Sequence, residues 1–346
     1  MSAASDPLLL RARLRAGLVE KVEIVSPRVD PSPVFLGLKP EDAAILAGRL
    51  FSLCPVSQSL AARTAGDAAL GVMVEAATRR AWTLGLVCER LGEMLRASLL
   101  DWPGAAPVSE DMGRLRDALK ALRALPEAGA AVLPELRAAT KGLGLGGVDK
   151  KSFFDRQASE ARDDESQVVM APREPDFLAA GDNAEIFAAM IRDRGFSRAP
   201  TLPGRCPETG ASARRGCSGN LADRLEARRD DMTAALDTIE QLLRGGEPPQ
   251  DALIAMGGNG RGFAAVDSAR GRLYHSVQLD EAGRIADYRI VAPTEWNFHP
   301  EGPFARALRA ARVGAGAEAK RRIERLAFVF DPCIRAVAEI VGETLA

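Results

Sequence analysis

The chain has 346 residues, a formal net charge of -1, and 47% hydrophobic and 27% charged residues. This composition is typical of a globular protein of one large or two smaller domains, and we expect a single domain over residues 1–346. The near-neutral charge gives no reason to expect a nucleic-acid partner. Charged residues interrupt the apolar runs, which excludes a membrane span, and the N-terminus lacks the pattern of a secretory signal. We therefore expect a cytoplasmic protein without membrane partners.

The N-terminal part predicts a β-hairpin followed by two helices. Residues 9–25 alternate apolar with charged side chains around an Ala-Gly turn, which is typical of a hairpin. KPEDAAILAGRLF predicts a helix, because Pro40 suits the first turn and the acidic residues after it complement the helix dipole. Cys54 follows in the break before another helix that begins near Pro55.

The middle of the chain predicts helices and one polar segment. Apolar residues recur at three and four residue intervals in TRRAWTLGLVCERLGEMLRASLL, which predicts a long helix that buries Cys88. SEDMGRLRDALKALRAL predicts another helix, capped by Ser109. The polar sequence at about 142–180 has little periodicity, and we expect a flexible segment there. LADRLEARRDDMTAALDTIEQLLRGG then predicts a long helix that ends at glycines.

The C-terminal part predicts β structure at about 262–292 and helices after it. GGNGRG precedes the β segments and lacks the Lys-Ser/Thr ending of a phosphate-binding loop, so it predicts a loop that enters a strand. Two helices then lead to Asp331-Pro332-Cys333, and we expect a last helix to end the chain. The sum is an α+β fold, mainly helical, with small β elements near the N-terminus and at about 262–292.

The five cysteines do not predict a disulfide framework, because their number is odd and they are widely scattered. Cys206 and Cys217 are too far apart in sequence for a zinc-ligand pair. Cys54 and Cys333 each begin a Cys-x-x pattern that lacks its second thiol. Ser57 stands where the second cysteine of the first pair would be, and Ala336 where that of the second would be. Taken singly, each cysteine is more often structural than a ligand.

Six segments occur in a fixed order along the chain. They are GLVEKVEIVSP; LCPVSQSLA; PETGASARR, with Glu208, Gly210, Ala213 and Arg214; DSARGRLYH, with Arg270 and Gly271; IVAPTEWNFHP, with Pro293, Thr294, Trp296 and Asn297; and FDPCIRAV. In this order they resemble the motifs of nickel-iron hydrogenase large subunits and, within that superfamily, the shorter accessory proteins of the HupK/HoxV type. The resemblance implies a hydrogenase large-subunit-like fold. Residues 100–180 resemble nothing in that family.

The departures from the family motifs bear on activity. In the enzymes that this chain resembles, four cysteines hold nickel and iron, and the second cysteine of each pair bridges the two metals. Ser57 and Ala336 occupy those bridging positions here, and Glu339 replaces the histidine that closes the last motif. The Arg-x-Glu-Gly-His segment of the family has no counterpart near the N-terminus. We therefore expect no hydrogen turnover and no nickel.

What the resemblance implies instead is a carrier of iron. Cys54 and Cys333 are the predicted thiolate ligands of a transient Fe(CN)2(CO) fragment, because soft donors suit low-spin iron(II). Arg270 and Thr294 occupy the positions from which the enzymes donate hydrogen bonds to the cyanides. The two retained cysteines correspond to terminal nickel ligands, so iron binding here requires a different placement or an additional ligand. His299, Glu339 or water are the candidates.

Three functions remain open from the sequence. The first is an assembly scaffold that accepts the iron fragment from a HypC/HypD-type maturation complex and passes it to a hydrogenase large-subunit precursor. The second is a metal-free chaperone that binds a precursor or a maturation factor through its large-subunit-like surface. The third is a working enzyme, which would require bound nickel. We expect the scaffold.

Overall fold

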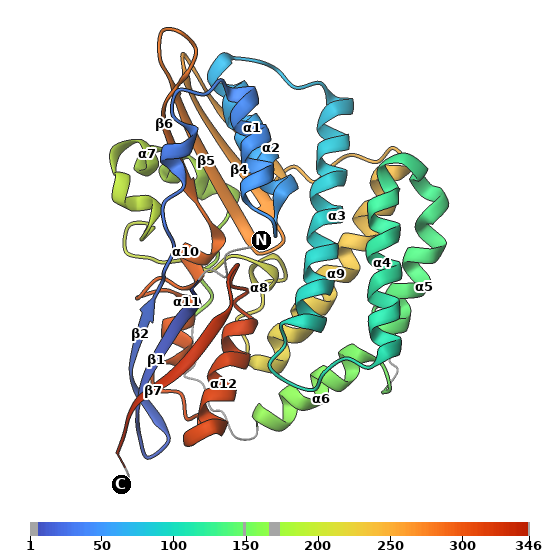
Figure 1. Ribbon diagram of the computed structural model, residues 1–346, viewed down its shortest axis with the longest axis vertical. Helices are drawn as coiled ribbons and strands as arrows, with labels where there is room; N and C mark the ends of the chain where they lie inside the picture. The colour runs from blue at the N-terminus through green and yellow to red at the C-terminus, as the bar shows by residue number, and fades with distance from the viewer. Residues whose placement is uncertain (1–5, 148–149, 166–173, 345–346) are drawn as a thin grey trace.

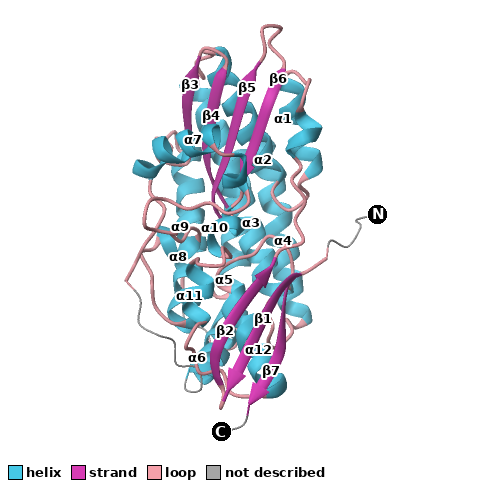
Figure 2. Ribbon diagram, turned by 90° about the vertical axis from the view of Figure 1, so that its left-hand side faces the viewer, coloured by secondary structure: helices cyan, strands magenta, loops and turns pink. Residues whose placement is uncertain are grey.

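A computed structural model describes residues 6–147, 150–165 and 174–344. It is an elongated molecule with a four-stranded sheet at one end, a three-stranded sheet at the other and helices alongside both (Figures 1 and 2). The strands are β1 (Leu8–Arg15), β2 (Leu18–Val25), β3 (Leu253–Gly258), β4 (Arg261–Ser268), β5 (Gly271–Leu279), β6 (Ile285–Val291) and β7 (Ala336–Thr344).

Helices α1 to α9 precede the four-stranded sheet in the sequence, and α10 to α12 follow it. The α-helices are α1 (Pro40–Leu50), α2 (Pro55–Leu70), α3 (Ala76–Leu100), α4 (Ser109–Ala128), α5 (Leu133–Leu143), α6 (Phe153–Glu165), α7 (Asn183–Arg192), α8 (Ala211–Arg214), α9 (Leu221–Leu243), α10 (Pro293–Asn297), α11 (Pro303–Leu308) and α12 (Gly316–Phe328). The 3-10 turns of the described residues are η1 (Ser32–Phe35), η2 (Gly129–Val132), η3 (Ala180–Asp182) and η4 (Arg194–Ser197). No helix within the described ranges combines the length and the apolar sequence needed to cross a bilayer.

The four-stranded sheet is antiparallel in the order β3-β4-β5-β6, and helix α2 packs closely on it. The contact is close because Gly262 in β4 has no side chain: a Cβ there would lie 1.8 Å from the carbonyl oxygen of Ala65 in α2. The expected β structure at about 262–292 is confirmed by β4, β5 and β6. Strand β3 was not predicted. GGNGRG forms the end of β3, the turn and the start of β4.

The three-stranded sheet has the order β2-β1-β7, with β1 antiparallel to β2 and parallel to β7. The predicted N-terminal hairpin is confirmed, whereas the predicted last helix is wrong, because residues 336–344 form a strand. Its pairing begins with Leu8 opposite Ala336. Strand β1 buries every second residue from Leu8 to Leu14 and leaves an edge that β7 fills. A partner strand from the other end of the chain cannot be read from local periodicity.

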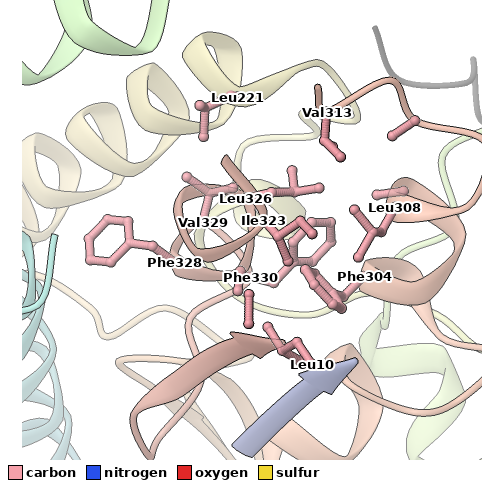
Figure 3. Packing of buried hydrophobic residues seen from close by; sticks show 14 of the residues in the cluster. Leu10, Leu221, Phe304, Leu308, Val313, Ile323, Leu326, Phe328, Val329 and Phe330 are labelled. Carbon is pink, nitrogen blue, oxygen red and sulfur yellow. The ribbon is translucent and has the colours of Figure 1, made fainter. Parts of the chain in front are cut away.

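A hydrophobic cluster lies under the three-stranded sheet and fixes the segment that precedes Cys333 (Figure 3). Phe328, Val329 and Phe330 belong to this cluster, together with Leu10 of β1 and Phe304 of α11. The rings of Phe304 and Phe330 meet edge to face at 5.7 Å. Because core side chains are close-packed, these three residues fix the position of the backbone up to Asp331.

The helical half packs α3 and α9 against α4, α5 and α6. The predicted flexible segment at about 142–180 is wrong for the part that forms α6, where Phe153 and Phe154 are only 2% and 3% exposed. The charged residues of α6 have partners on other helices: Asp164 pairs with Arg325 of α12. A polar sequence therefore forms a packed helix here, because its charged side chains have partners. Residues 148–149 and 166–173 of the predicted segment lie outside the described residues.

The helices predicted before and after the polar segment are confirmed, whereas the described chain has three helices, α10, α11 and α12, where two were expected before Asp331. Helix α2 begins at Pro55, directly after Cys54, and Cys88 lies within α3 and packs against the helical core. The predicted cap at Ser109 is wrong by one residue: the N-cap of α4 is Val108, whose N–H donates to Asp111 Oδ2 over 2.9 Å.

Candidate functional site

Two loops from opposite ends of the chain lie in one region of the molecule. Cys54 lies between α1 and α2, and Cys333 lies between α12 and β7. Cys333 and Leu53, the neighbour of Cys54, line the same cavity of about 560 Å³, as does Arg270. The charge of Cys333 is also among the causes that raise the pKa of Cys54. The fold thus brings the two half-motifs together.

The Cys54 thiol is held in its neutral form. Burial raises its pKa to about 12, nearby Glu89 adds to the rise, and the Arg270 guanidinium opposes it. Only the thiolate is a good metal ligand, so a soft metal that binds here must displace a proton. At neutral pH the thiol is therefore also a poor target for oxidation until a metal arrives.

Glu89 of α3 occupies the N-terminus of α2 and was missed by the sequence analysis. It accepts the backbone N–H groups of Val56 at 2.6 Å and Ser57 at 2.9 Å, and the Ser57 hydroxyl at 2.5 Å. These contacts satisfy donors that a helix start leaves free, and they commit the Ser57 side chain to a carboxylate. Burial raises the pKa of Glu89. The sequence around Glu89 does not indicate this contact, because the start of α2 is distant from Glu89 in the sequence.

Arg270, in the turn between β4 and β5, offers a hydrogen-bond donor at the cavity wall. Its side chain is 6% exposed; Nη2 donates to Glu93 Oε1 at 2.5 Å and Nε donates to the Pro332 carbonyl at 3.2 Å. Within the part of the chain that the structure describes, Nη1 is buried and has no hydrogen-bond partner. A buried N–H without a partner costs about 1–3 kcal/mol, so an acceptor that reached Nη1 would gain a strong contact.

Thr294 of α10 binds the backbone of the Cys333 loop. Its buried Oγ1 accepts the Cys333 N–H at 3.1 Å. Three residues on, Asn297 donates through Nδ2 to the Phe330 carbonyl at 2.9 Å. Between these contacts Asp331 has a φ of 57°, and its carboxylate pairs with buried Arg228 at 2.5 Å. The loop that carries Cys333 is thus fixed on both sides.

Arg28 is a second guanidinium near the cysteines that the sequence analysis did not identify. It lies between β2 and η1, and its Nη1 donates to Glu295 Oε1 at 2.8 Å. The pKa of Arg28 is raised, chiefly by the charge of Cys333 and also by Glu295 and Cys54. Two guanidiniums from separate loops, those of Arg28 and Arg270, therefore interact electrostatically with the cysteines. Nothing in the Pro-rich extended segment around Arg28 indicates that its side chain interacts with the cysteines.

The two candidate extra ligands are engaged elsewhere. His299 Nδ1 accepts the Glu301 N–H at 3.0 Å, and Glu339 pairs with Arg11 at 3.0 Å on the three-stranded sheet. Glu339 lies away from Cys333 because β7 carries the chain onward by about 3.3 Å per residue. No three His, Cys, Asp or Glu side chains form a metal-binding group among the residues with described positions. The prediction that His299 or Glu339 adds a ligand is therefore not supported by the fold.

The site combines two soft sulfur donors with N–H and O–H groups placed around them. Such a set suits a soft metal ion whose own ligands accept hydrogen bonds. The second position of each Cys-x-x pattern contributes no donor, because Ser57 binds Glu89 and Ala336 begins β7.

Comparison with known proteins shows which family and which fold this chain resembles. Residues 208–338 match the family described as nickel-dependent hydrogenase. Among solved structures, the chain is similar to the nickel-iron-selenium hydrogenase of Desulfomicrobium baculatum, with a TM-score of 0.66, 15% identity, and 93% of this chain and 95% of that chain covered. It is also similar to the enzyme from D. vulgaris Hildenborough, with a TM-score of 0.63, 17% identity, and 92% and 94% covered. These matches confirm the hydrogenase large-subunit-like fold.

Curated relatives are similar over most of their length. The chain is 42% identical to the hydrogenase expression/formation protein HupK of Rhizobium leguminosarum bv. viciae, over 87% of each chain. It is 32% identical to HupK of Bradyrhizobium diazoefficiens, over 90% of each, and 30% identical to HoxV of Cupriavidus necator, over 88% of this chain and 90% of that one. The chain belongs to the HupK/HoxV family of hydrogenase expression/formation proteins.

Proposed function

We propose that the protein is a scaffold that holds an Fe(CN)2(CO) fragment on Cys54 and Cys333 during hydrogenase maturation. The observations that carry the proposal are that Arg270 and Cys333 line one cavity and that, among the described residues, Nη1 of Arg270 is buried without a hydrogen-bond partner. A cyanide nitrogen is a strong acceptor of such a hydrogen bond. The two thiolates supply the soft donors that low-spin iron(II) prefers.

The charges around the site support an anionic cargo. Iron(II) with two cyanides and two thiolates carries net negative charge, which burial alone would disfavour. The Arg270 guanidinium lowers the pKa of Cys54, and the charges of Cys333 and Cys54 raise the pKa of Arg28. Glu93 binds Arg270 at 2.5 Å and Arg96 at 2.7 Å, and Arg96 also pairs with Asp101 at 2.7 Å.

The same site is poorly suited to a resident two-metal centre. The bridging positions of the enzymes that the chain resembles hold Ser57, bound to Glu89, and Ala336, which has no donor. We therefore propose an accessory protein without hydrogen turnover and without nickel. Two anchoring thiolates leave the other positions on iron to its own ligands and to water or a partner's donor. Fewer protein bonds to iron favour release over retention.

The cargo must come from one protein and leave to another. In the proposed sequence, which takes place in the cytoplasm, a HypC/HypD-type complex donates the fragment and a hydrogenase large-subunit precursor accepts it. The resemblance to the large subunit supports this order, because a donor that recognises a large-subunit-like surface can recognise both proteins.

Infrared spectroscopy tests the proposal. Protein purified without oxygen from maturation-competent cells should show cyanide and carbonyl stretching bands, and Cys54→Ala with Cys333→Ala should abolish them. Cys217→Ala is a matched control, because Cys217 is also half-buried and neither it nor its chain neighbours line the cavity. Absence of bands from the unchanged protein, or bands that persist in the double variant, would contradict the scaffold.

A metal-free chaperone is the second candidate. It is favoured by the lack of a third ligand beside the two cysteines in the described chain and by apolar side chains at the cavity, where Leu53 is 37% and Leu100 is 50% exposed. Such a surface can contact a partner protein. Full hydrogenase maturation in cells that carry only the double cysteine variant would establish this function and exclude the scaffold.

A further inference from the structure

A chain of hydrogen bonds runs from the Cys54 sulfur into the four-stranded sheet. Gln58, one turn along α2, donates from Nε2 to Cys54 Sγ at 3.8 Å. Its Oε1 lies 2.9 Å from His275 Nε2 in β5, and His275 Nδ1 lies 2.7 Å from the Tyr288 hydroxyl in β6. Gln58, His275 and Tyr288 are all buried. None of them belongs to the set of residues that the sequence analysis selected.

The direction of each bond follows from the donors and acceptors. Gln58 Oε1 only accepts, so His275 Nε2 carries the proton and donates to it. His275 is neutral at pH 7, because burial lowers its pKa to about 3, and its Nδ1 therefore accepts the Tyr288 hydroxyl proton. Tyr288 donates to His275, His275 to Gln58, and Gln58 to the sulfur. Every donor in the chain is directed toward Cys54.

The neighbouring side chains hold this direction. The Tyr288 ring stacks on Phe35 of η1 at 4.3 Å between centroids, which fixes the hydroxyl. His275 cannot turn its ring without losing both contacts in a buried site. In the structure the amide of Gln58 presents its NH2 group to the sulfur and its oxygen to His275. Buried polar groups always need hydrogen-bond partners. That need alone does not explain why this series of hydrogen bonds ends on the half-buried thiol of Cys54.

We propose that Gln58 is a positioning residue for the sulfur of Cys54, and that His275 and Tyr288 fix the orientation of its amide. This inference rests on the proposed function, because it concerns the sulfur as a metal ligand. A sulfur bound to metal keeps lone pairs that accept hydrogen bonds, and such bonds orient it and withdraw electron density from the metal. These hydrogen bonds thus orient the lone pairs of the Cys54 sulfur and tune how strongly the sulfur donates.

The test uses Co²⁺ as a probe, because its absorption reports sulfur ligation directly. We expect Gln58→Leu to weaken Co²⁺ binding to the metal-free protein about 10-fold and to move the sulfur-to-cobalt band. Gln278→Leu is the matched control, since Gln278 is an exposed glutamine on the same strand as His275, and it should change neither. Tyr288→Phe keeps the stacked ring and removes only the hydroxyl, so it should shift the band in the same direction by less.

A second readout uses the iron fragment. In protein that carries it, Gln58→Leu should move the carbonyl band to lower wavenumber, because the sulfur then donates more electron density, while Gln278→Leu leaves the band in place. Equal cobalt affinity and equal band positions in the two glutamine variants would overturn the inference. If the unchanged protein shows no infrared bands, the scaffold fails, and the cobalt measurement still decides the role of Gln58.

Discussion

Cys333 donates its backbone N–H to Oγ1 of Thr294 over 3.1 Å, although 39 residues separate them in the chain. Thr294 lies in a segment that resembles a motif of the enzymes, and here its oxygen supports the loop that carries a proposed ligand. The hydroxyl proton of Thr294 remains free to be donated in another direction. One side chain can therefore fix the cysteine and contact the cargo together.

The contact predicts a specific effect of Thr294→Val. Valine keeps the shape but leaves the Cys333 N–H without its acceptor, so we expect the free energy of unfolding to fall by about 1–3 kcal/mol. The infrared bands of the iron fragment should also weaken. Thr294→Ser keeps the oxygen and is the control, with both properties close to those of the unchanged protein. Urea unfolding and infrared spectra measure the two effects, and equal results for valine and serine would contradict a role of the oxygen.

Arg270→Lys separates charge from hydrogen bonding. Lysine keeps the positive charge beside Glu93 but loses the planar set of donors that reaches Glu93, Pro332 and the cavity at once. We expect the cyanide bands to shift and the yield of loaded protein to fall about 10-fold. Arg96→Lys is a matched control, because Arg96 binds the same carboxylate at 2.7 Å and lines the same cavity. If both variants load equally, Nη1 of Arg270 does not bind the cargo.

Glu89→Gln should change how stability depends on pH. Burial raises the pKa of Glu89 above its ordinary 4.5, so the folded protein binds this proton more tightly than the unfolded chain does. The contribution of such a group is fully present below its unfolded pKa and is lost as pH rises through its folded pKa. The advantage of the unchanged protein over Glu89→Gln should therefore be about 1 kcal/mol at low pH and shrink as pH rises.

Urea unfolding of both proteins at several pH values measures this difference. Glu226→Gln is the control, because Glu226 is an exposed residue of α9, and its difference from the unchanged protein should stay constant. A difference for Glu89→Gln that grows with pH would show that the carboxylate is stabilised as an anion by the start of α2.

The sequence predicted those parts of the fold whose signal is local. The hairpin at 9–25, the helix after Cys54 and the long helices α3 and α9 all have periodic apolar patterns and recognisable ends. Strand β7 was assigned to a helix because local sequence does not indicate its partners, which are β1 at the opposite end of the chain and α12. Helix α6 was missed because its charged residues are paired with distant arginines.

The candidate site shows the same division. Cys54, Cys333, Arg270 and Thr294 were found through their motifs, and the fold brings them to one region. Arg28, Glu89 and the chain of Gln58, His275 and Tyr288 were not found as site residues. Each of them acts through a contact between segments that are distant in sequence. Their residue types carry no motif, so only the folded arrangement identifies them.

The packing of α2 on β4 gives a last prediction, because α2 carries Cys54 at its N-terminus. Gly262→Ala would place a Cβ 1.8 Å from the Ala65 carbonyl oxygen and 2.6 Å from the Ala69 nitrogen. Both are backbone atoms of α2, which cannot move away easily. We expect a loss of at least about 1–3 kcal/mol in the free energy of unfolding and a smaller yield of loaded protein, since α2 must move away from the sheet. Gly113→Ala is the matched control: Gly113 lies in α4 with nothing within 4 Å of an added Cβ, so alanine there should stabilise the helix by about 0.5–1 kcal/mol. Opposite shifts of the two urea midpoints are therefore expected, and a Gly262→Ala protein as stable as the unchanged one would show that the α2–β4 contact does not determine the position of Cys54.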